Sequence, residues 1–73
     1  MKETILFTIV GCKGCEEIKN DPEFKDDILK GIIKVKECDP NDRDKMKTCI
    51  EAEKKDDFDG YPSLYNEEGK KLI

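Results

Sequence analysis

The chain has 73 residues, enough for one domain with a thin hydrophobic core. Charged residues make up 44% of it and apolar ones 36%, and the net charge of −4 comes from 14 basic side chains interleaved with 18 acidic ones. No basic face is evident, so nucleic-acid binding is not expected, and no apolar run approaches the roughly 20 residues that cross a membrane. The apolar run near the N-terminus is too short and too poorly flanked for a signal peptide, so we expect a cytoplasmic protein.

Residues 5–10, Ile-Leu-Phe-Thr-Ile-Val, predict a strand, because β-branched and aromatic residues suit a pleated, buried surface. Their nearly unbroken apolar character indicates burial on both faces, in the middle of a sheet that helices cover. Gly11 provides a turn, after which Cys12 and Cys15 open a helix. A C-x-x-C at such a strand-to-helix corner is typical of a thioredoxin-like redox site.

The helix that begins at the C-x-x-C is expected to break at Asp21. An Asp before Pro22 is a good N-cap followed by a good first helical residue, so a second helical piece is predicted over residues 22–30. Phe24 and Ile28 are four residues apart and should share the buried face of that piece.

Residues 32–38 mostly alternate apolar and polar side chains, which predicts a second strand, less buried than the first and at an edge of the sheet. A helix is predicted over residues 42–55, after an Asp-Pro-Asn-Asp turn. Its apolar face should carry Met46, Cys49 and Ile50.

The end of the chain predicts two short strands, residues 61–65 and 70–73, joined by a hairpin turn at 66–69. The element order is therefore βαβαββ within a single domain, residues 1–73. The first two strands should be parallel because a helical crossover joins them, and the last two antiparallel because a tight hairpin does.

This order resembles the thioredoxin/glutaredoxin superfamily, and two motifs carry the resemblance. Residues 7–15, Phe-Thr-Ile-Val-Gly-Cys-Lys-Gly-Cys, look like the glutaredoxin-type strand that leads into a C-x-x-C. Residues 60–63, Gly-Tyr-Pro-Ser, are similar to the family's cis-proline loop. The resemblance covers nearly the whole chain. It implies a thioredoxin-like α/β fold, a four-stranded mixed sheet with helices on both faces, in which the usual C-terminal helix is absent.

The resemblance also implies an activity, that of a protein-disulfide oxidoreductase. Cys12 would be the thiolate that attacks a substrate disulfide, and Cys15 the thiol that resolves the mixed disulfide. Pro62 would be a cis-proline that packs against the disulfide, and the backbone of Tyr61 would be available to pair with a substrate chain.

Disulfide exchange needs a thiolate, and a helix N-terminus favours negative charge at Cys12. Gly14 keeps side chains away from the sulfur and Lys13 adds a positive charge, so both are expected to contact the substrate. Glu16 and Glu17 oppose the thiolate electrostatically. We therefore expect a small intracellular disulfide reductant rather than a strong oxidant.

The expected partners are a protein or small-molecule disulfide as substrate and glutathione or a reductase as electron donor, with no cofactor and no metal. The glycine pair with which many glutaredoxins hold glutathione is absent, which leaves the donor open. Leu6 stands where thioredoxins carry a buried Asp, so a specialised proton acceptor for the resolving thiol is missing, as in glutaredoxins.

The missing last helix allows two arrangements. In one, the sheet face beside the first helix is bare, which favours a homodimer or docking to a partner. In the other, the broken first helix covers that face alone.

Two other functions stay open, a non-catalytic thioredoxin-fold binding module and a zinc site made by the four cysteines. The chain has no His, so zinc would need Cys38 and Cys49 as further ligands, at a spacing that is poor for a structural site. Cys49 is expected in the core, because free cysteine is commonly buried as a small hydrophobe. A Cys38–Cys49 disulfide is disfavoured, because Cys49 is expected two turns into its helix and Cα atoms more than about 7 Å apart cannot be bridged.

Overall fold

The hydrophobic strand β1 (Thr4–Ile9) forms the centre of a mixed sheet, in the computed structural model that describes residues 3–72. β2 (Ile33–Cys38) pairs with it in parallel, and β3 (Ser63–Tyr65) pairs with its other edge antiparallel. The sheet order β2-β1-β3 confirms the predicted central first strand and edge second strand. β1 occupies the centre because it carries large apolar side chains on both faces, Leu6 on one and Phe7 on the other, and both need cover.

Three helices complete this small α/β fold: α1 (Lys13–Asn20), α2 (Pro22–Leu29) and α3 (Arg43–Glu53). The predicted break between the first two is confirmed. The Asp21 side chain accepts a hydrogen bond from the Glu23 N–H at 2.9 Å, so it caps α2 while its extended backbone ends α1.

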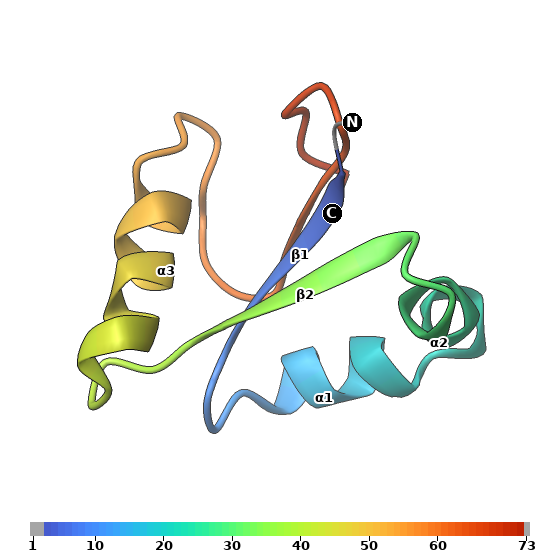
Figure 1. The fold of residues 1–73 in the computed structure, drawn as a ribbon, viewed down its shortest axis with the longest axis horizontal. Helices are drawn as coiled ribbons and strands as arrows, with labels where there is room; N and C mark the ends of the chain where they lie inside the picture. Colours follow the sequence, from blue (N-terminus) through green and yellow to red (C-terminus); the bar gives the residue numbers. More distant parts are fainter. Residues whose placement is uncertain (1–2, 73) are drawn as a thin grey trace.

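The helices cover both faces of the sheet, with α1 and α2 on one side and α3 on the other (Figure 1). Strand alternation divides the core accordingly. Leu6 and Leu64 face α1 and α2, where Phe24 and Ile28 pack against them as predicted. The opposite cluster consists of Phe7, Tyr65 and Ala52 of α3. On the α1–α2 face, Leu6 is 1% exposed and Leu64 3%. This is the arrangement expected if the broken first helix covers that face alone.

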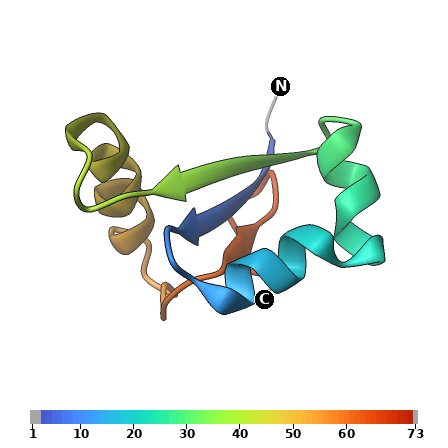
Figure 2. The ribbon, with the colours of Figure 1, turned by 90° about the horizontal axis from the view of Figure 1, so that it is seen from below.

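The carboxyl ends of β1 and β2 lie at the same end of the sheet. Figure 2 shows both arrows pointing toward the place where α1 and α3 begin. This end carries the C-x-x-C motif, because Gly11 with its positive φ of 75° turns the chain from β1 into α1. No helix within residues 3–72 is long and apolar enough to cross a bilayer.

Two details of the predicted fold are wrong for the described residues. The sheet there has three strands rather than four, because Lys71 forms only an isolated bridge to Tyr65; Ile73, the last residue of the predicted fourth strand, lies outside the described range. On α3, Met46 and Ile50 are 46% and 49% exposed rather than buried. The predicted burial of Cys49 is confirmed, and beside it the helix turns the small Ala52 toward the sheet, a side chain that gave a weaker hydrophobic signal than Met46 or Ile50.

Candidate active site

Cys12 is the N-cap of α1, and its sulfur takes the role of a capping side chain. The Cys12 Sγ accepts a hydrogen bond from the Cys15 backbone N–H at 3.1 Å, and the Cys12 carbonyl accepts one from the Glu16 N–H at 3.3 Å. The sulfur therefore lies among the unpaired N–H groups of the first helical turn, where negative charge is stabilised. This is the environment that disulfide exchange requires of an attacking thiolate.

The loop before β3 lies beside this helix start, although it is far away in the sequence. The Cys12 Sγ lies 4.0 Å from the Tyr61 carbonyl oxygen, to which its thiol donates. A Cβ added at Gly14 would lie 3.5 Å from the Pro62 Cδ, so the proline ring packs directly on the C-x-x-C segment. The Tyr61–Pro62 peptide bond is cis, which confirms that prediction. The structure thus brings Cys12, Gly14, Tyr61 and Pro62 together.

The two thiols differ sharply in their surroundings. Cys12 is half-buried and open to a partner, whereas Cys15 is 1% exposed. Burial raises the pKa of the Cys15 thiol to about 11, and its hydrogen bond with Cys12 adds to that increase. Cys15 is therefore held as a protonated thiol at neutral pH, whereas Cys12 is the sulfur that another molecule can reach.

The raised pKa of Cys15 predicts a pH dependence for the step in which it would resolve a mixed disulfide at Cys12. Only the thiolate attacks, and burial, the largest cause of the raised pKa, persists when Cys12 carries a substrate group, so the resolution rate should keep rising with pH well above neutral. The measurement is stopped-flow release of nitrothiobenzoate, a coloured thiolate, from Cys12 loaded with that group. A rate that levels off near neutral pH would contradict the burial argument, since Cys15 would then already be ionised there.

The remaining predicted contact residue, Lys13, is exposed beside Cys12, as are Glu16 and Glu17.

The Tyr61 side chain is held by packing, because its ring meets that of Phe58 edge-on with centroids 5.1 Å apart. Burial raises the pKa of the Tyr61 hydroxyl, and the nearby Glu53 carboxylate raises it further. Tyr61 is therefore a neutral, packed side chain that holds its own carbonyl in position near Cys12. The sequence analysis did not single out Phe58. The one signal that could have pointed to it is that it is an aromatic residue in an otherwise charged loop.

Cys38 and Cys49 form a disulfide, contrary to the sequence prediction, with Cα atoms 5.1 Å apart. The prediction failed because it considered only how many helical turns separate Cys49 from the start of α3, and not the direction in which α3 runs. The turn after β2 carries the chain outward and α3 then runs back beside β2, as the Lys36–Glu51 ion pair at 3.4 Å also requires. Cys49 thereby returns to the level of Cys38, and the two thiols that a zinc site would need are bonded to each other.

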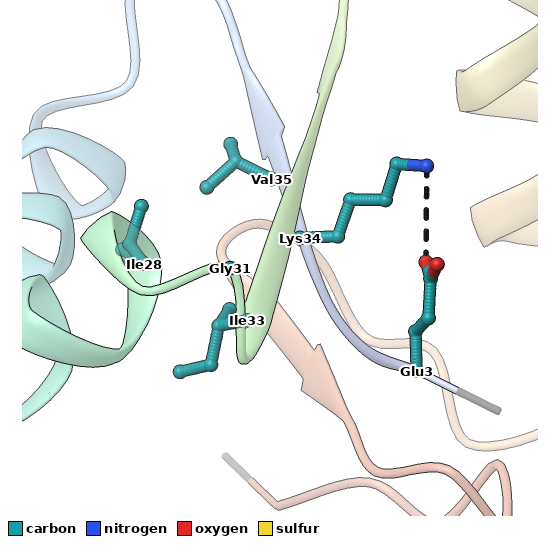
Figure 3. A pocket seen from close by; sticks show the side chains of 6 residues that line it. All are labelled: Glu3, Ile28, Gly31, Ile33, Lys34 and Val35. Carbon is teal, nitrogen blue, oxygen red and sulfur yellow. Dashed lines mark ion pairs between the residues drawn. The ribbon is translucent and has the colours of Figure 1, made fainter. Parts of the chain in front are cut away.

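At the other end of the sheet, the described residues bring no pair of cysteines together. A pocket of about 440 Å³ lies there between the end of α2 and the start of β2, and Figure 3 shows Ile28 and Val35 on one side of it. Lys34 points away from them toward Glu3, with which it forms an exposed ion pair at 3.8 Å. Within residues 3–72, no group of three or more acidic, cysteine or histidine side chains gathers as a metal would need.

No family model, no curated protein and no solved structure matches this chain. Any statement about its activity therefore depends on the geometry of its own residues.

Proposed function

We propose that this chain is a thiol–disulfide oxidoreductase with a thioredoxin-like fold, acting in the cytoplasm as a small disulfide reductant. One observation carries the proposal. A half-exposed cysteine caps a helix three residues before a buried cysteine, and the loop with Pro62 packs on the same turn. The Cys12 thiol is thus accessible to a substrate, whereas the buried Cys15 thiol is available only to a sulfur bound at Cys12.

The reaction follows from this asymmetry. The Cys12 thiolate attacks one sulfur of a substrate disulfide, forms a mixed disulfide and releases the first substrate thiolate. Cys15 loses its proton and attacks the Cys12 sulfur, which releases the second substrate thiolate and leaves Cys12 and Cys15 oxidised. Two electrons from glutathione or from a reductase then restore the dithiol.

Three residues would guide the substrate. The Tyr61 backbone lies beside the Cys12 sulfur and would pair with the extended chain next to a substrate cysteine. Gly14 has no side chain to obstruct the approach, and Lys13 would attract the developing thiolate. The buried Leu6 offers no proton acceptor to Cys15, so the proton of Cys15 would leave to solvent or to the departing thiolate.

The test is turnover of a disulfide substrate. With dithiothreitol or glutathione as donor, the chain should accelerate the reduction of insulin or of a small mixed disulfide above the rate in buffer. A binding module that retains the cysteines without using them gives no acceleration. That result would reject the proposal in favour of the alternative.

A further inference from the structure

The Cys38–Cys49 disulfide lies at the same end of the sheet as the C-x-x-C motif. Cys38 is the last residue of β2 and lies opposite Ile9 in the register with β1. The Val10 N–H donates to the Cys38 carbonyl at 3.1 Å, and the Cys12 N–H donates to the Ile9 carbonyl at 3.3 Å. A short run of backbone hydrogen bonds therefore connects the two cysteine pairs.

The disulfide attaches α3 covalently to the end of β2. The helix buries two side chains, Cys49 and Ala52, and the second of these contributes a single methyl group. The ion pair between Lys36 and Glu51 is partly exposed, and pairs of that kind contribute little to stability. Opening of the disulfide would therefore leave α3 loosely held.

α3 in turn supports the residue that lies beside Cys12. Ala52 packs in the cluster with Phe7 and Tyr65, and Tyr61 packs against that cluster. The Tyr61 carbonyl is the group 4.0 Å from the Cys12 Sγ. A looser α3 would loosen Tyr61 and so change the access to Cys12.

The disulfide can be reached from outside on one side. A pocket of about 260 Å³ has Ile9, Met46, Cys49, Ile50 and Tyr61 in its wall. Cys49 is 8% exposed, whereas Cys38 is completely buried. An incoming thiolate would therefore meet the Cys49 sulfur, with Cys38 as the leaving group.

We propose that Cys38–Cys49 is a second, reversible redox site that low-molecular-weight thiols such as glutathione open, and that its state controls Cys12. In the first step a thiolate attacks the Cys49 Sγ, forms a mixed disulfide there and releases the Cys38 thiolate. A second thiol molecule attacks the mixed disulfide and leaves Cys49 as a thiolate, so two electrons enter the protein and one disulfide of the small thiol is produced. Cytosolic disulfides are usually transient and redox-sensing, so this inference accords with the proposed compartment and rests, for its biological role, on the proposed function.

Peptide mapping tests the first half of the inference. Trypsin places the four cysteines in four different peptides, residues 3–13, 14–19, 37–43 and 48–54. The full chain is incubated in excess reduced glutathione, quenched with acid and alkylated. Cys38 and Cys49 should both become alkylated, and both should return to the disulfide in oxidised glutathione. If they stay bonded while Cys12 and Cys15 are reduced, the disulfide is structural and the inference is overturned, with the proposed function intact.

The rate of Cys12 alkylation by iodoacetamide tests the second half, independently of turnover. In the Cys38→Ala/Cys49→Ala variant, Cys12 should react about fivefold faster or more than in the chain with the bond closed, within the usual range of coupling between sites. Met46→Ala changes the same pocket wall and keeps the bond, so it should leave the rate unchanged. An equal Cys12 rate in the double variant and the parent would overturn the coupling.

The double variant could lose its fold, and the switch could exist without disulfide turnover, so both cases need their own measurement. If circular dichroism shows that the double variant is unfolded, the Cys12 rate is measured instead in the parent chain at glutathione ratios that open Cys38–Cys49 to different extents. A Cys12 alkylation rate that does not change with the opened fraction of Cys38–Cys49 would overturn the coupling. A faster Cys12 without turnover of any disulfide substrate would support the switch and reject the proposed function.

Discussion

Replacing Cys12 with serine is expected to lower the turnover of disulfide reduction by at least about 10³-fold, since loss of a catalytic nucleophile usually removes nearly all of the chemistry. Serine keeps the size and the capping role of the side chain, because its hydroxyl can accept the Cys15 N–H as the Cys12 Sγ does. The helix should therefore stay in place while the nucleophile is lost. The measurement is the rate of insulin or mixed-disulfide reduction, with the parent chain and the Cys12→Ser variant at equal concentration.

Cys15→Ser is the matched control for this variant. It leaves the half-exposed Cys12 able to attack, so a stable mixed disulfide should accumulate and be visible as an added mass in the peptide of residues 3–13. Turnover that survives the Cys12→Ser change would mean that another thiol carries the reaction. A mixed disulfide that forms on Cys15 in preference to Cys12 would reverse the roles assigned to them.

Replacing Phe7 with alanine is expected to cost about 3–5 kcal/mol of unfolding free energy. Phe7 is completely buried in β1, meets Tyr65 edge-on with centroids 5.8 Å apart, and belongs to the cluster that receives α3. At about 0.05–0.15 kcal/mol per residue, a chain of 73 residues has only about 4–11 kcal/mol in total. The variant should therefore be marginally folded, with a thermal midpoint at least about 12 °C lower.

Leu29→Ala provides the control, because Leu29 is 76% exposed at the end of α2. Its unfolding free energy should stay within about 0.5 kcal/mol of the parent. Both values come from urea unfolding followed by circular dichroism. A Phe7→Ala cost below about 1 kcal/mol would show that the cluster between β1 and α3 is not a main part of the core.

The sequence predicts the parts of the fold that local chemistry determines. The apolar run of β1 places it at the centre of the sheet, and Asp21 before Pro22 divides the first helix because capping and the proline ring act within a few residues. The C-x-x-C and the loop with Tyr61 and Pro62 were recognised because each motif is short and contiguous. Their closeness in space followed from the resemblance alone.

The failures concern long-range geometry. On α3 the burial of Cys49 was predicted correctly, but its buried neighbours were assigned as the large Met46 and Ile50, whereas the small Ala52 is the side chain that packs on the sheet. The Cys38–Cys49 bond depends on the direction in which α3 returns along β2, and no local pattern specifies that direction. Within the described residues, the predicted fourth strand contributes a single bridge between Tyr65 and Lys71.

The central claim is that Cys12 and Cys15 form a reversible redox couple, and its most direct test is their equilibrium with glutathione or dithiothreitol buffers of known potential. After acid quenching, alkylation and trypsin digestion, the peptides of residues 3–13 and 14–19 report the two thiols separately. The two thiols are expected to titrate together as one two-electron couple, nearer to the about −270 mV of thioredoxin than to the about −120 mV of a strong oxidant. A midpoint at the oxidising end would reverse the proposed direction of electron flow. If the two cysteines form no reversible disulfide at any potential, the claim is contradicted and the binding module becomes the better explanation.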